Sequence, residues 1–132
     1  MTGLKTVPSD FSVKETLDRL STIAQSNGLT VFIRIDHSAN AAQNGLQLRP
    51  TELILFGNPK AGTVLMQDSQ TSGLDVPVRA LAWEDENGKV WLTYNEASWI
   101  ASRHGLTEKS STVVKAIEDG MTMVCNASTN SK

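Results

Sequence analysis

Cysteine and histidine are scarce in this chain of 132 residues, which has one cysteine, Cys125, and two histidines. A single thiol cannot form a disulfide within the chain, which fits a reducing compartment. A closed structural zinc site needs four cysteine or histidine ligands at suitable spacing, so we expect no metal site within one chain. A metal shared between two subunits stays an open alternative.

Long apolar runs and an excess of basic charge are also missing. No apolar run approaches the length of a membrane span, and residues 1–10 lack the charged and then apolar order of a signal peptide. The formal net charge is −2, whereas domains that bind nucleic acid broadly carry a dense basic face. We therefore expect a cytoplasmic protein that binds neither nucleic acid nor a membrane.

The composition that is present, 39% hydrophobic and 20% charged, is typical of a globular protein. The length fits one domain. Gly120 weakens the last predicted helix, and chain ends are often poorly ordered. We predict a single domain over residues 1–126 and a flexible tail over residues 127–132.

The strongest local pattern is a helix that begins at Ser12, where Glu15 completes a capping box, and ends at Gly28. The remaining pattern predicts strands at 4–7, 29–37 and 52–56, a hairpin at 78–94, and helical segments at 38–44, 63–69, 95–105 and 110–124. The order β-α-β-α-β-(α)-β-β-α-α predicts an α/β (α+β) fold, a two-layer sandwich whose mixed sheet has its helices on one face.

The hairpin is marked by Asn87-Gly88, which favours a two-residue loop because both turn positions take positive φ. That loop places Trp83 opposite Leu92 on the apolar face and leaves Trp91 on the other face. Together with the strand at 29–37, the other face is expected to carry Phe32, Arg34, Asp36, Trp91 and Thr93. A face of this mixed character suits a dimer contact or the floor of a ligand site.

Three stretches carry a family resemblance, namely IRIDH at 33–37, GLQLRPTEL at 45–53 and FGNPKAGTVLM at 56–66. Shorter matches follow at 76–78, 83–85, 88–91 and 94–95. Over roughly residues 4–106 the chain resembles the family called domain of unknown function 302, with GNPKAGT as the most specific part. The resemblance implies a two-layer α/β fold, a homodimer, and a module that also occurs fused to other domains. It implies no reaction.

The heptad from Gly57 to Thr63 follows a strand and leads toward a helix, where backbone N–H groups can hold an anion. It departs from the nucleotide phosphate loop, because Lys60 lies inside it and Thr63 directly follows Gly62. A plain turn is the alternative. We predict a small anionic ligand bound by Arg49, Asn58, Lys60, Gly62 and Thr63.

Asp36 and His37 end a strand, a common place for site residues. His37 can serve as a general acid or base with Asp36, or Asp36 can cap the next helix together with Ser38. His104 precedes a helix end and is expected to complement its C-terminus. We expect the 36–37 and 57–63 stretches to meet at one corner of the sheet.

These patterns favour a homodimeric module that binds a small anion. An enzyme that uses His37 and an interaction domain that uses the face with Trp91 are the alternatives. The sequence identifies neither a reaction nor a cofactor.

Overall fold

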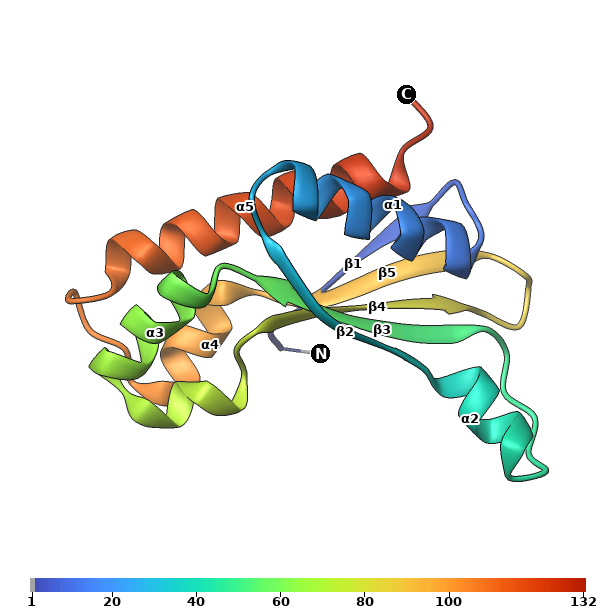
Figure 1. Ribbon diagram of the computed structural model, residues 1–132, viewed down its shortest axis with the longest axis horizontal. Helices are drawn as coiled ribbons and strands as arrows, with labels where there is room; N and C mark the ends of the chain where they lie inside the picture. The colour runs from blue at the N-terminus through green and yellow to red at the C-terminus, as the bar shows by residue number, and fades with distance from the viewer. Residues whose placement is uncertain (1) are drawn as a thin grey trace.

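A five-stranded sheet organises residues 2–132, which this computed structural model describes (Figure 1). The elements are β1 (Leu4–Ser9), α1 (Val13–Ser26), β2 (Thr30–Asp36), α2 (His37–Gln43), β3 (Thr51–Gly57), α3 (Pro59–Asp68), the 3-10 helix η1 (Gln70–Leu74), β4 (Val78–Glu84), β5 (Val90–Asn95), α4 (Ala97–His104) and α5 (Ser111–Thr129). α1 and α5 lie together on one face of the sheet, so the predicted two-layer α/β sandwich is confirmed.

The strand order is β1-β5-β4-β3-β2, and every pairing is antiparallel, where a mixed sheet is predicted. A parallel pair needs a connection that crosses the sheet, usually through a packed helix. The connection between β2 and β3 carries α2, which has no buried residue and projects beyond the end of the sheet. β3 therefore returns directly beside β2 in the opposite direction.

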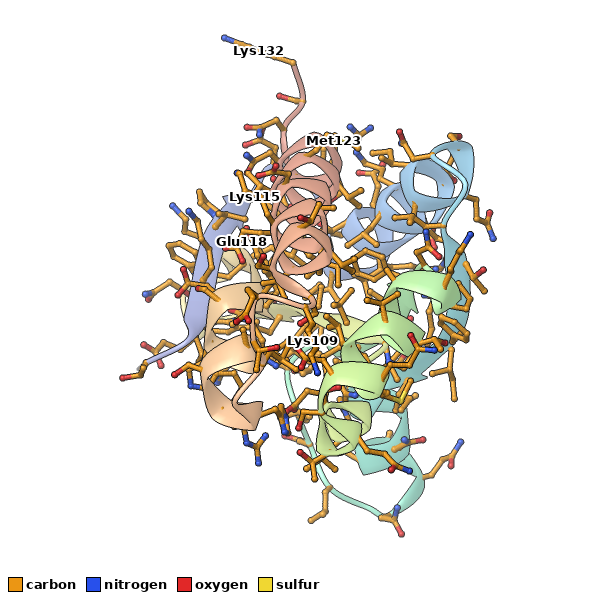
Figure 2. All side chains as sticks on the ribbon, turned by 90° about the vertical axis from the view of Figure 1, so that its left-hand side faces the viewer. Lys109, Lys115, Glu118, Met123 and Lys132 are labelled. Atoms are coloured by element: carbon orange, nitrogen blue, oxygen red, sulfur yellow. The ribbon has the colours of Figure 1, made fainter. Side chains whose placement is uncertain are left out.

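The core lies between the sheet and the layer of α1 and α5. The Ser12 side chain accepts from the Glu15 backbone N–H at 3.1 Å, which confirms the predicted cap of α1. The apolar side of α1 is buried over the central strands, where Ile54, Phe56 and Leu92 are at most 1% exposed. Viewed from the end of the molecule that carries α3 and α4, these two helices stand side by side below α5 (Figure 2).

α5 extends further than the sequence pattern indicates. The flexible tail predicted from residue 127 is wrong at its start, because the helix continues to Thr129, and Ser128 and Thr129 are buried. The Asp10 backbone N–H donates to the Thr129 carbonyl at 2.8 Å. This bond ties the end of α5 to the turn that follows β1.

The β4–β5 hairpin has a three-residue loop rather than the predicted two-residue loop. The Asp85 N–H donates to the Lys89 carbonyl, and Gly88 takes φ +77° in a G1-bulge arrangement. The Asp85 carboxylate accepts from the backbone N–H groups of Asn87 and Lys89 and holds this loop. The pairing shifts by one residue, so Trp83 lies opposite Trp91 rather than Leu92.

That shift changes the composition of the open sheet face, because a one-residue slip turns every side chain of a strand to the other side. Trp91 lies on the open face as predicted, but Trp83 joins it there, with ring centroids 6.3 Å apart. Arg34 faces α1 instead and donates to Asp18 and Glu52. The open face consists mainly of half-buried or exposed apolar side chains: Ile33, Ile35, Leu53, Leu55, Leu81, Trp83 and Trp91.

Candidate functional site

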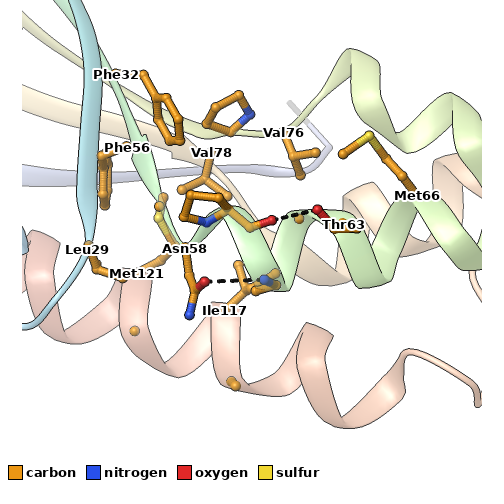
Figure 3. A pocket seen from close by; sticks show the side chains of 17 residues that line it. Leu29, Phe32, Phe56, Asn58, Thr63, Met66, Val76, Val78, Ile117 and Met121 are labelled. Atoms are coloured by element: carbon orange, nitrogen blue, oxygen red, sulfur yellow. Dashed lines mark hydrogen bonds between the residues drawn. The ribbon is translucent and has the colours of Figure 1, made fainter.

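A cavity of about 390 Å³ opens between α3, α5 and the adjoining ends of β2 and β3 (Figure 3). Seventeen residues line it, and none of them is Asp, Glu, Lys, Arg or His. Asn58 and Thr63 contribute the polar side chains of its wall. Pockets of this size and mainly apolar lining are typical of sites for small molecules.

Small residues on two facing helices keep the cavity open. Ala61 and Gly62 of α3 face the space across from Ala116 and Gly120 of α5. A Cβ atom added at Gly120 would meet nothing within 4 Å. Glycine inside a helix costs about 1 kcal/mol relative to alanine. Gly120 therefore makes α5 less stable at the position where it lines the open cavity.

Larger aromatic, aliphatic and sulfur-containing side chains form the rest of the wall. The β2–β3 register shifts between Val31 and Ile33, which leaves Phe32 as the extra residue of a bulge. A bulge re-aims the side chain that it carries, and Phe32 faces the cavity while remaining 46% exposed. Phe56 is 1% exposed and links the cavity to the core.

The heptad from Gly57 to Thr63 borders this cavity but is not an open anion cradle. Pro59 starts α3, and the Asn58 side chain accepts from the backbone N–H groups of Lys60 at 2.9 Å and Ala61 at 3.4 Å. The Thr63 hydroxyl donates to the Pro59 carbonyl at 2.8 Å. Amides expected to bind an anion are thus occupied by a helix cap, and the Lys60 side chain does not line the cavity.

The expected meeting of the 36–37 and 57–63 stretches is wrong. In the β2–β3 register, Asp36 lies opposite Glu52, whereas Gly57 lies opposite Thr30 at the other end of the strands. Six residues of strand separate the two ends by about 20 Å. Arg49 belongs to the far end as well, where its Nε donates to the Glu84 carbonyl at 3.2 Å, so it cannot share a ligand with Lys60.

Asp36 caps the N-terminus of α2, which is one of the two roles predicted for it. Its carboxylate accepts from the Ala39 N–H at 2.9 Å and from the Ser38 hydroxyl at 2.7 Å. These hydrogen bonds hold the pKa of Asp36 below its usual range. His37 is the first residue of α2, away from the cavity, so the structure does not bring it into the same site as Asn58 and Thr63.

Two further residues, Cys125 and His104, lie outside the lining of the cavity. Burial raises the pKa of the Cys125 thiol to about 12, which keeps it protonated and unreactive at neutral pH. His104 lies at the C-terminus of α4 as expected, but its ring also contacts Thr71 and Asp75. The sequence pattern missed this contact, because these partners lie 33 and 29 residues away and no spacing rule connects them.

Comparison with known proteins places the fold. The family model described as "Domain of unknown function DUF302" matches residues 5–124. The crystal structure of an uncharacterized conserved DUF302 protein from Bacillus stearothermophilus superposes with a TM-score of 0.84. The superposition covers 96% of this chain and 98% of that one at 15% sequence identity, so it concerns the fold alone.

Two relatives with higher sequence identity to this chain than the Bacillus protein are named as ion channels. Proteins called "Fluoride-specific ion channel FluC 1" from Brucella suis and "Fluoride-specific ion channel FluC 2" from Brucella melitensis are each 57% identical over 118 residues. The match covers 89% of this chain but only 46% and 44% of those proteins, so the chain spans less than half of their length. Within residues 2–132, no helix has the length and apolar character needed to cross a membrane.

Proposed function

The chain belongs to the family of domains of unknown function DUF302, and we propose that it is a homodimeric module that binds a small, neutral, mainly apolar molecule in the cavity beside α3. The observation that carries this proposal is the absence of any charged side chain among the seventeen residues that line the cavity. Transfer of an apolar ligand from water into such a wall is favourable by about 25 cal/mol for each Å² buried. An unpaired anion would lose its hydration there without compensation.

The polar groups of the cavity wall would orient the ligand. Asn58 holds the start of α3 through its side-chain oxygen, so its amide nitrogen is fixed in place at the wall. The Thr63 hydroxyl donates to Pro59 and retains acceptor capacity. A ligand with an apolar body and one hydrogen-bonding group fits this arrangement.

Filling the cavity should weaken ligand binding without removing any contact of the core. We expect the wild-type protein to bind the neutral fluorescent probe N-phenyl-1-naphthylamine and Gly120→Leu to bind it at least about tenfold more weakly, because the new side chain extends into the open space at Gly120. Fluorescence titration measures both affinities.

The matched control for this titration is Asp119→Leu, which adds the same side chain at the neighbouring position of α5, where the native side chain is 67% exposed. Asp119→Leu should bind the probe as the wild type does. Failure of the wild type to bind, or equal affinity in Gly120→Leu and the wild type, would contradict the proposal.

The dimer half of the proposal concerns the open sheet face, for which we commit to a second copy of the chain as the occupant. The apolar side chains of this face carry no charge pattern that would select a partner of another kind. Arg79 lies among them, and its Nε is buried without a hydrogen-bond partner among residues 2–132. A second copy would present the same mainly apolar surface, Arg79 included, as a two-fold interface requires.

The projecting segment from α2 to β3, residues 37–50, adds to this surface. The five strands give the face a footprint of about 500 Å², whereas a stable interface buries about 800 Å² per partner. The projecting segment carries Leu46 and Leu48, which are 66% and 50% exposed. In a dimer these leucines supply the further apolar area.

The names of the Brucella relatives favour a second candidate function, namely a role in the transport of fluoride. Their printed name states a fluoride channel, and this chain matches part of those proteins at 57% identity. Deleting the gene for this chain should then make its host more sensitive to fluoride, measured as growth across a fluoride series. Unchanged growth in the deletion strain would count against this candidate.

A further inference from the structure

A hydroxyl, an imidazole and a carboxylate form a continuous chain at the junction of η1 and α4, outside the lining of the cavity. Thr71 Oγ1 lies 3.0 Å from His104 Nδ1, and His104 Nε2 is hydrogen-bonded to Asp75 Oδ2. The side chains of His104 and Asp75 are 6% and 12% exposed, whereas Thr71 is exposed. A reactive group at the surface is thus backed by two groups shielded from water.

The order of these contacts fixes which imidazole nitrogen carries the proton. Asp75 also accepts from the Arg103 guanidinium at 2.9 and 3.1 Å, which holds it as a carboxylate acceptor. His104 Nε2 therefore donates to Asp75, and in the neutral form of the imidazole the lone pair then lies on Nδ1. That lone pair faces the Thr71 hydroxyl at hydrogen-bond distance.

We infer that Thr71 is a hydroxyl nucleophile, activated by His104 and oriented through Asp75, that accepts acyl groups from small esters. A nucleophile within hydrogen-bond reach of a base that is itself held by a third group is the geometric signature of covalent catalysis. The inference is independent of ligand binding in the cavity, because none of these three residues lines it.

The reaction proceeds in two balanced steps. Thr71 Oγ attacks the ester carbonyl carbon while its proton passes to His104 Nδ1, and the leaving alkoxide takes that proton as the C–O bond breaks. A water molecule then repeats the sequence on the acyl-threonine and releases the carboxylic acid and the free hydroxyl. His104 ends each step neutral, and Asp75 stays a carboxylate throughout.

The surroundings of Thr71 offer an apolar contact and a positive charge to a substrate. Gly73 and Leu74 are exposed beside it, and the Leu74 side chain at 66% exposure offers an apolar contact to an acyl group. The Arg103 side chain, 45% exposed, brings a positive charge to the same network. A short neutral ester, whose acyl group can contact Leu74, is therefore the substrate used in the test.

The test uses p-nitrophenyl acetate with the full chain and follows both p-nitrophenol release and acetylation, the latter by mass spectrometry of peptides. We expect acetyl-Thr71 in the wild type and a loss of release of about 10²-fold in Thr71→Ala, because positioned proton transfer contributes at least that factor. Thr71→Ser should retain both release and the adduct.

Controls separate this role from a structural one. Ser102→Ala, at an exposed position of α4 outside the network, should react as the wild type does. His104→Gln should lose the adduct while circular dichroism reports an intact fold. Should His104→Gln unfold, the site of acetylation in the wild-type protein still decides the question. Acetylation confined to lysines, or equal release from Thr71→Ala and the wild type, would overturn the inference.

Discussion

Leu81→Asp is expected to convert the proposed dimer into monomers. Leu81 lies on β4, the middle strand, with its half-buried side chain on the open face and Leu53 as its neighbour across the β3–β4 pair. In a face-to-face dimer, two added carboxylates would be taken out of water without partners, at a cost of several kcal/mol. Sedimentation velocity should show a dimerisation Kd raised by more than about 10³-fold.

The control for Leu81→Asp is the same substitution at Leu74, an apolar residue of η1 that is 66% exposed and lies off the sheet. Leu74→Asp should leave the dimer intact, which separates a general effect of added charge from a local one. A wild-type protein that sediments as a monomer at high concentration would refute the proposed interface. So would a Leu81→Asp variant that remains dimeric.

Phe56→Ala is expected to lower the free energy of unfolding by about 3–5 kcal/mol. Phe56 is 1% exposed and contacts both the core and the cavity, so its removal joins a new void to an existing one. The protein cannot easily collapse around such a space, because α3 and α5 are held apart over the cavity. Urea denaturation followed by circular dichroism measures the change.

Phe32→Ala provides the matched comparison, since it removes the same ring from a neighbouring position of the cavity wall. Phe32 is 46% exposed at a bulge and leaves little buried contact behind. We expect it to cost less than about 1 kcal/mol while still weakening binding of the naphthylamine probe. Similar losses of stability in the two variants would contradict the expectation that Phe56 stabilises the fold while Phe32 serves mainly to bind the ligand.

Elements with local signals could be predicted from the sequence. Ser12 and Glu15 mark the start of α1 within a few residues. Gly105, which takes a left-handed conformation, marks the end of α4. Such signals act through backbone groups one turn away. They survive in the folded protein because tertiary packing does not compete with them.

The register of the hairpin could not be read from Asn87-Gly88 alone. The dipeptide favours a two-residue loop, but the Asp85 carboxylate accepts two backbone N–H groups and the Trp91 indole N–H, which stabilises a longer loop. These contacts lower the pKa of Asp85. The Asp85 side chain thus supports the register that places Leu81 and Trp83 on the open face.

The candidate site was predicted only in part. GNPKAGT does border the cavity, because the residues that end a strand and start a helix also shape the space between them. Which residues lie beside that segment depends on whether β3 runs parallel or antiparallel to β2. No local sequence pattern predicts this direction. The network of Thr71 and His104 depends in the same way on how η1 docks against α4.

The Phe32 bulge has a consequence for how copies of this protein can associate. A sheet edge with free N–H and C=O groups invites other chains to extend it, and proteins suppress this with bulges and prolines. The bulge interrupts the regular ladder at the β2 edge, and at the opposite edge Pro8 of β1 has no N–H to offer. With both borders unsuited to strand addition, growth into edge-to-edge fibres is disfavoured, and in the proposed dimer contact through the open sheet face would close after two subunits.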